Sequence, residues 1–153
     1  MSHIVCVDII IHDLDLFKKT CKAIGLEFRE NQKTFRWYNR WMNDYHGKDA
    51  AYMHGIDPKT YGNCEHACGV PNNKSAYEVG LMKNPKGAGY VLVWDSWNSG
   101  YGLMKVVGDN CDKLFQEYAK QVTLKELKAK GYTLSKTNAY DNGEIELEMT
   151  NYN

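Results

Sequence analysis

The chain has 153 residues, and its 19 basic and 19 acidic side chains give a formal net charge of zero. This length is typical of one domain, and 43% hydrophobic with 25% charged residues excludes wholesale disorder. Zero net charge argues against a protein whose whole surface binds nucleic acid or anionic membrane. There is no apolar run of transmembrane length and no recognisable signal peptide, so we expect a cytoplasmic protein with reduced cysteines.

The first thirty residues predict a strand, a helix and a second strand. A β-branched run at residues 3–11 predicts a strand that is buried on both faces and lies near the middle of a sheet. Residues 14–24 carry apolar side chains at helical spacing, with Asp13 as the N-cap and Gly25 as the C-terminal stop. A short strand is expected at residues 26–30.

The next forty residues divide into an alternating part and an irregular part. In residues 34–41 Phe35, Trp37, Asn39 and Trp41 alternate with Arg36, Tyr38 and Arg40, and this period of two predicts a strand. Residues 43–74 show no sustained periodicity and contain most of the turn formers. A loop of about 30 residues is uncommon in a compact domain. We therefore expect a long insertion or functional loop, ordered by its own aromatic packing or by a ligand or metal.

The second half of the chain predicts a hairpin, a short strand, a long helix and a closing hairpin. Their expected bounds are residues 75–82 and 89–94, 103–107, 111–130, and 132–137 with 144–150. The apolar stripe of the long helix is Leu114, Phe115, Tyr118, Ala119 and Val122. In the last strand Ile145, Leu147 and Met149 are expected to face inward and the alternating glutamates to face water.

This order of elements predicts an α+β fold in a single domain over residues 1–153. Two helices cannot cover both faces of so many strands. We therefore expect one single mixed or mostly antiparallel sheet with two helices packed on one face.

Several short motifs resemble a known family. They are Met-Ser-His at the start, Ala23-Ile24-Gly25-Leu26, Cys64-Glu65-His66-Ala67, Tyr77-Glu78-Val79-Gly80, Trp94-Asp95, Tyr118-Ala119, Ala129-Lys130-Gly131-Tyr132 and Asp141-Asn142-Gly143-Glu144-Ile145. The sequence resembles the conserved plastid open reading frame 35 family of cyanobacteria, red-algal plastids and bacteriophages, and its middle is similar to phage-encoded members. The resemblance implies a compact α+β fold in a cytoplasmic or phage setting. It implies no activity and no catalytic residues.

A candidate ligand site lies on the predicted strand at residues 34–41, where arginines interleave with aromatic rings. Guanidinium groups suit phosphate recognition and rings suit stacking. The residues of this predicted site are Arg36, Trp37, Tyr38, Arg40 and Trp41. The alternative is that the rings are core residues and the arginines form an ordinary solvated face.

A second group of polar and aromatic residues follows the predicted strand at residues 89–94. Polar groups between rings can orient a small ligand, so Trp94, Asp95 and Trp97 join the candidate ligand site. The alternative is packing at the end of a strand, with Asp95 forming an Asx turn.

The irregular segment also contains metal-ligand types. Cys64, His66 and Cys68 are candidate zinc ligands, with His46 or His54 completing the set. Their spacing matches no standard zinc motif. The alternative is that the cysteines are structural thiols in a loop packed by aromatic residues.

The sequence contains no Walker loop, dinucleotide motif or nucleophile elbow, so we expect no catalytic residues. The leading hypothesis is a non-catalytic binding protein, phage-encoded, that captures a small anionic ligand such as a nucleotide-type signal. One alternative is a protein-interaction module that acts on a host protein or a larger assembly, because Trp, Tyr and Arg are enriched at interface hot spots. Another is a small domain stabilised by zinc, the one cofactor considered.

Overall fold

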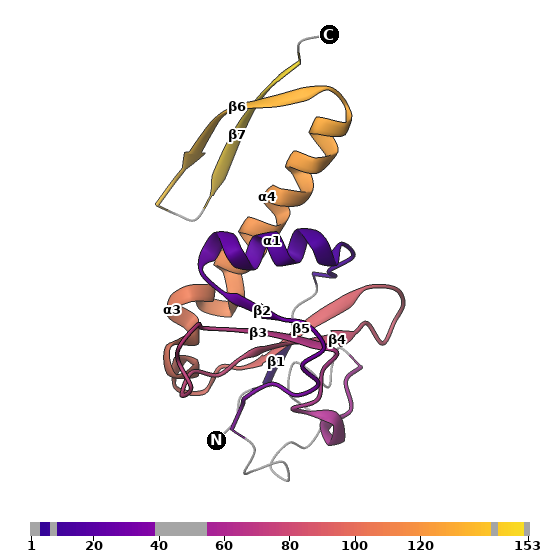
Figure 1. Ribbon diagram of the computed structural model, residues 1–153, viewed down its shortest axis with the longest axis vertical. Coiled ribbons are helices and arrows are strands. Elements are labelled where there is room, and N and C mark those ends of the chain that lie inside the picture. Colours follow the sequence, from indigo (N-terminus) through magenta and orange to yellow (C-terminus); the bar gives the residue numbers. More distant parts are fainter. Residues whose placement is uncertain (1–3, 7–8, 39–54, 142–143, 152–153) are drawn as a thin grey trace.

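The computed structural model describes residues 4–6, 9–38, 55–141 and 144–151, and it has an α+β fold (Figure 1). Five antiparallel strands form a sheet in the order β1-β5-β4-β3-β2. The strands are β1 (Ile4–Cys6), β2 (Glu27–Arg29), β3 (His66–Gly69), β4 (Val79–Lys83) and β5 (Tyr90–Asp95). The predicted hairpin around residues 84–87 is confirmed as β4–β5.

The first strand lies at one end of this order, so its predicted place near the middle of the sheet is wrong. Ile4 pairs with Asp95 and Cys6 with Val93, and both Ile4 and Cys6 are buried. The burial predicted on both faces is confirmed only in part, because Val5 is half-buried and Ile9 is 42% exposed. The apolar run could not predict the number of strand neighbours, because loops and side chains can bury an edge strand as well as another strand can.

Helices contribute to the core on one side of the sheet. Val79, Leu81, Leu92 and Trp94 pack in one cluster with residues of α1 (Leu14–Ile24), α3 (Leu103–Val107) and α4 (Asp112–Ala129). The caps predicted for α1 are confirmed, since the Asp13 carboxylate accepts a hydrogen bond from Leu16 N (3.1 Å) and Gly25 adopts φ 85°. Among the described residues, no helix has the length and apolarity needed to cross a membrane.

The alternate residues of the same strands pack in a second cluster, which irregular segments complete. Val91, Val93 and Ala67 meet Phe35, Ile56 and Tyr61 there. Phe35 lies directly over Gly80, where an added Cβ would be 2.5 Å from the Phe35 ring. The glycine at the second position of β4 therefore makes room for this ring.

Two predicted strands are not strands in the structure. Residues 103–107 form helix α3. The prediction of a strand failed because apolar periodicity over five residues cannot distinguish a helix from a strand. Residues 34–38 belong to no strand, apart from a bridge between Thr34 and Asn63. Residues 39–41 lie outside the described part of the chain. The segment 43–74 was expected to be irregular, yet its residues 66–69 form β3 inside the sheet.

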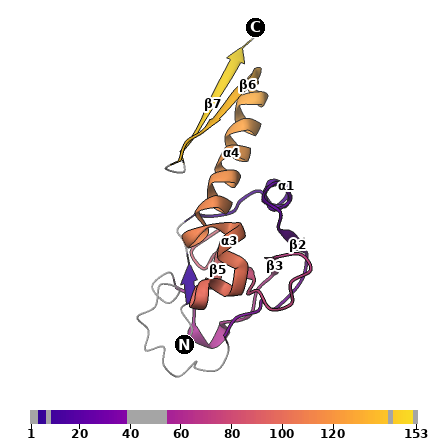
Figure 2. The same cartoon turned by 90° about the vertical axis from the view of Figure 1, so that its left-hand side faces the viewer.

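The C-terminal quarter of the chain forms an arm that projects from the five-stranded sheet (Figures 1 and 2). We call α4, β6 (Tyr132–Ala139) and β7 (Ile145–Asn151) the arm. Helix α4 and the closing hairpin confirm the predicted elements within a few residues. The prediction of one sheet is wrong here, because among the described residues β6 and β7 pair only with each other and form a separate two-stranded sheet.

Candidate functional site

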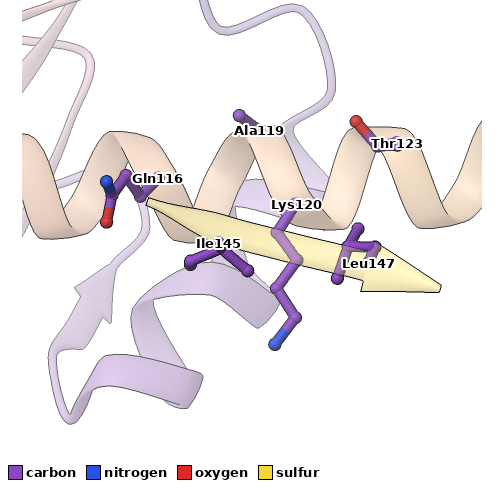
Figure 3. A pocket seen from close by; sticks show the side chains of 6 residues that line it. All are labelled: Gln116, Ala119, Lys120, Thr123, Ile145 and Leu147. Carbon is purple, nitrogen blue, oxygen red and sulfur yellow. The ribbon is translucent and has the colours of Figure 1, made fainter. Parts of the chain in front are cut away.

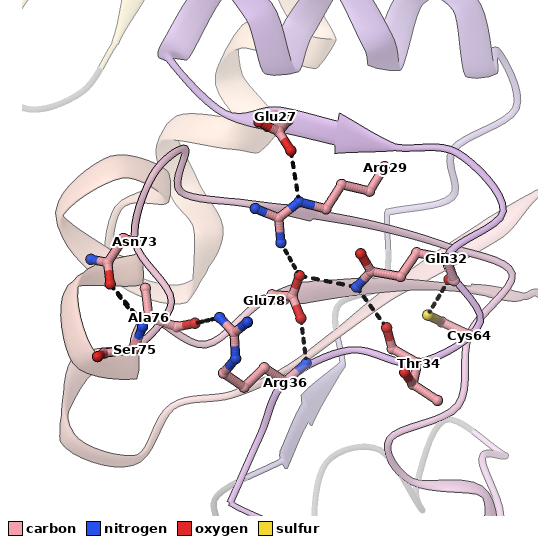
Figure 4. Close-up of polar contacts among 10 residues, drawn as sticks. All are labelled: Glu27, Arg29, Gln32, Thr34, Arg36, Cys64, Asn73, Ser75, Ala76 and Glu78. Atoms are coloured by element: carbon pink, nitrogen blue, oxygen red, sulfur yellow. Dashed lines mark hydrogen bonds and ion pairs between the residues drawn. The ribbon is translucent and has the colours of Figure 1, made fainter.

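A buried carboxylate organises the segment that carries the predicted arginines (Figure 4). Glu78, which is 4% exposed, forms an ion pair with Arg29 and accepts hydrogen bonds from Gln32 Nε2 (3.0 Å) and Arg36 N (2.8 Å). Arg36 Nη1 in turn donates to Ala76 O (2.7 Å). Both described guanidinium groups therefore have partners within the protein.

A second buried carboxylate, that of Asp95, holds the same segment further along. Asp95 is fully buried and accepts hydrogen bonds from Tyr38 N (3.0 Å) and Trp97 N (2.9 Å). The bond from Trp97 is the Asx turn that was the alternative interpretation of this site. Glu78 and Asp95 thus accept hydrogen bonds from the backbone N–H groups of Arg36 and Tyr38, which a neighbouring strand would accept in a sheet.

Aromatic rings gather after β5, where the backbone takes a rare conformation. Asn98, Ser99, Gly100 and Tyr101 all have positive φ between 49° and 65°, in the 3-10 segment η3 (Trp97–Gly102). The Tyr77 and Tyr101 rings are 5.0 Å apart, and Tyr101 is 44% exposed. Burial and the nearby Asp95 carboxylate raise the pKa of Tyr77 to about 12. A negative charge next to these rings does not favour an anion there.

The structure brings only part of the predicted ligand site together. Arg36 and Tyr38 lie along one segment beside Glu78 and Asp95, whereas the Trp37 ring packs against Tyr61 (6.2 Å between centroids). Trp94 points to the helix side of the sheet and is fully buried, and its Nε1 has no hydrogen-bond partner among the described residues. Arg40 and Trp41 lie outside the described residues.

The three candidate zinc ligands are distributed over both faces of the sheet. Cys68 packs in the cluster on the helix side, whereas Cys64 packs in the opposite cluster and donates from Sγ to Gln32 O (3.1 Å). Burial, with the Glu78 and Glu65 carboxylates, raises the pKa of Cys64 to about 12. No group of three metal-ligand side chains occurs in the part of the chain that the structure describes. His46 and His54 lie outside it, so the zinc hypothesis stays a prediction.

His66 is a buried side chain with a structural partner. Its Nδ1 accepts a hydrogen bond from Asn31 N (2.9 Å), and its ring lies 5.6 Å from the rings of both Phe28 and Tyr90. Burial lowers the pKa of His66 below its ordinary value. The neutral imidazole therefore fits this position better than the imidazolium.

The arm contains a groove that the sequence did not predict. A space of about 370 Å³ lies between α4 and β7 (Figure 3). Its lining residues are Gln116, Ala119, Lys120, Thr123, Ile145 and Leu147. The four helical residues recur at intervals of three, one and three, so they form one stripe along α4. The stripe is polar or small, while the facing strand residues are apolar and only half-buried.

The groove follows from this mismatch of side chains. Ala119 was assigned to the apolar stripe of the helix, but it is exposed in the structure because Leu114, Phe115 and Tyr118 turn toward the core instead. The inward direction predicted for Ile145 and Leu147 agrees with the structure, where both side chains are half-buried. The sequence pattern that could have predicted the groove is a helix stripe without large apolar residues, which faces an apolar strand.

The fold and these surfaces define a small α+β protein. The buried carboxylates at its sheet have partners within the protein, and its arm contains an open groove. Residues 46–148 match the model of a family described as a protein of unknown function (DUF1257). This match spans more than half of the chain, so the chain belongs to the DUF1257 family. Searches of curated proteins and of solved structures gave no significant match.

Proposed function

We propose that the protein is a non-catalytic interaction module and that it contacts a partner protein through the groove between α4 and β7. The observation that carries this proposal is the apolar face of β7, where Ile145 and Leu147 stay half-buried against a helix stripe that cannot cover them. The groove also lies within the residues that match the family, whereas residues 36–41 lie outside them.

Two physical arguments support this proposal. A two-stranded sheet is at best marginally stable in water unless its apolar face is covered. Apolar surface rimmed by polar residues is typical of a protein-interaction site. At this groove the rim includes Gln116 and Lys120, and the floor includes Ile145 and Leu147. A partner that fills the groove would bury apolar surface and stabilise the hairpin together.

Capture of a small anionic ligand, such as a nucleotide-type signal, ranks second. Arg36 and Tyr38 lie on one segment, which favours that hypothesis. However, Arg36 already donates to Ala76 O, and the Asp95 carboxylate opposes a negative charge. A thermal-shift screen against a nucleotide panel tests it. If no nucleotide raises the unfolding temperature, the small-anion proposal fails.

The interaction proposal is tested by photo-crosslinking in lysate of the source cell. A photoreactive residue at Thr123, inside the groove, is compared with one at Lys86, in the exposed turn between β4 and β5. We expect a discrete crosslinked protein from position 123 that is absent from position 86 and is lost when Leu147→Asp is added. Identical products from both positions would exclude the groove as the contact surface.

We also propose the finer assignment that the sequence suggests. In that assignment the protein is a phage-type member of the plastid open reading frame 35 family and acts in the cytoplasm of a host cell. The matched family supports membership of an uncharacterised conserved family. The genomic neighbourhood of the gene and fractionation of cells that express it would test the setting.

A further inference from the structure

One edge of β7 has backbone groups that point away from its strand neighbour. In the described part of the chain β7 pairs only with β6. Tyr140 N donates to Glu144 O (2.9 Å), so every second pair from there is hydrogen-bonded, including Asn138 with Glu146. Ile145 and Leu147 occupy the pairs between, so their N–H and C=O groups point toward the open edge.

The same two residues line the groove with their side chains. A strand that pairs with the open edge would hydrogen-bond to Ile145 and Leu147, and its alternate side chains would extend over the groove. Its other side chains would lie on the opposite face of the hairpin, beside Glu146 and Glu148. The groove and the edge therefore select the same kind of occupant, an extended segment with alternating character.

The charge on the outer face indicates what the second set of side chains should be. Glu146 and Glu148 are exposed, and Glu146 accepts a hydrogen bond from the Asn138 amide (2.9 Å). Neither glutamate belongs to an ion pair between described residues. Opposite charges on neighbouring strands attract, so lysine or arginine fits these positions. Glutamates on an edge strand also discourage aggregation, but that role alone does not account for the groove beside them.

The same charges argue against a second copy of this chain as the occupant. Antiparallel pairing of two β7 strands would bring Glu146 and Glu148 of one copy beside the same residues of the other. Like charges on neighbouring strands are destabilising. The occupant should therefore come from a different protein.

We infer that the arm binds an extended segment of another protein by strand addition to β7, and that this segment alternates apolar residues with lysine or arginine. This inference rests on the proposed function and names the chemistry of the partner. The apolar residues fill the groove over Ala119 and Leu147, and the basic residues pair with Glu146 and Glu148.

The test uses two peptides of nine residues and the full chain. One peptide alternates valine with lysine, and the control alternates valine with glutamate. Binding is measured by fluorescence anisotropy, and amide hydrogen exchange is measured by NMR with and without peptide. We expect the valine–lysine peptide to bind and to slow exchange at the amides of Ile145 and Leu147, while the valine–glutamate peptide does not bind.

Matched variants test separately whether binding depends on the charge of Glu146 and on the open groove. Glu146→Lys should weaken binding of the valine–lysine peptide about tenfold, and Glu126→Lys, an equal charge change on the exposed side of α4, should leave it unchanged. Thr123→Trp should abolish binding, because it fills the groove from the helix and leaves β7 intact.

Three outcomes would overturn strand addition. The first is peptide binding without protection of the Ile145 and Leu147 amides, and the second is equal binding of both peptides. The third is a stable dimer in which these amides are already protected, because a second copy would then be the occupant. If groove-specific crosslinking persists in any of these cases, the interaction module stands and only the strand chemistry is wrong. If crosslinking at Thr123 is also lost, the proposed function itself fails.

Discussion

The five-stranded sheet and the arm differ in how completely the rest of the chain covers their apolar faces. In the sheet both faces are covered, one by helices and one by irregular segments, and Leu81, Leu92 and Val93 are fully buried. In the arm β7 has an apolar face of the same kind, but Ile145 and Leu147 stay half-buried. A face that the chain covers itself supplies stability, whereas a face that it leaves partly open is available to a partner.

The largest expected effect comes from removing one leucine side chain from each region. Leu81→Ala should lower the free energy of unfolding by about 3 kcal/mol, because it leaves a cavity in a fully buried site. Leu147→Ala should cost less than about 1.5 kcal/mol, because part of that side chain is already in water. Urea unfolding measures both. Equal losses would show that the arm is packed as tightly as the sheet and would break the comparison.

The next effect concerns the buried carboxylate of the sheet. Glu78→Gln should cost about 3 kcal/mol, because it removes the charged partner of the partly buried Arg29. The matched control is Glu65→Gln, whose side chain is 38% exposed and pairs with Lys33 at 3.1 Å. That change should cost far less in the same urea assay, because an exposed ion pair contributes little. A small loss for Glu78→Gln would mean that the Arg36 segment is held by packing rather than by this carboxylate.

A smaller effect should appear when the pH is lowered. Burial lowers the pKa of His66 from 6.5, so the unfolded chain binds this proton more readily than the folded protein. The stabilisation is fully present above pH 6.5 and is lost as the pH falls through the lower, folded pKa. Urea unfolding between pH 7.5 and about pH 5.5 measures it.

The control for this pH dependence is His66→Gln, which keeps an acceptor for Asn31 N but does not titrate. The difference between the two proteins isolates the contribution of His66, because the carboxylates titrate in both. An identical loss of stability in the variant would assign the pH dependence to other groups.

The smallest effect should be the reactivity of the cysteines, all of which lie outside the arm. All five cysteines are buried and none forms a disulfide bond, and burial raises the pKa of Cys64 to about 12. Native protein at pH 8 should therefore react with a thiol reagent far more slowly than free cysteine. Protein unfolded in urea should release all five. Rapid labelling of one native thiol would show that part of the sheet opens as readily as the arm.

The sequence predicted elements whose signal is local and missed arrangements that depend on distant partners. The prediction of helix α1 is confirmed because its caps, Asp13 and Gly25, directly flank the apolar stripe in the sequence. Strand β3 was missed because His66–Gly69 is buried on both faces and contains small residues, so no alternation marks it. The alternation at residues 34–41 predicted a strand, but residues 35–38 form none. It could not show that Glu78 and Asp95 replace a strand neighbour.

The candidate sites follow the same division. The Asx turn at Asp95 was anticipated because it involves residues two apart. The partners of Arg36 could not be predicted, because Ala76 and Glu78 are about 40 residues away in the chain. The groove required knowing which stripe of α4 faces β7, and this depends on how the helix is rotated by its contacts with the sheet.

The strand order β1-β5-β4-β3-β2 has a consequence for how the chain folds. Both edges of the sheet come from the first 29 residues, but β2 pairs with residues 67–69 and β1 with residues 93–95. During synthesis these two strands therefore remain unpaired until much later segments have left the ribosome. The β4–β5 hairpin can form locally, so pairing should spread outward from the middle of the sequence. β1 and β2 precede the other strands of the sheet along the chain, yet they are the last to join it.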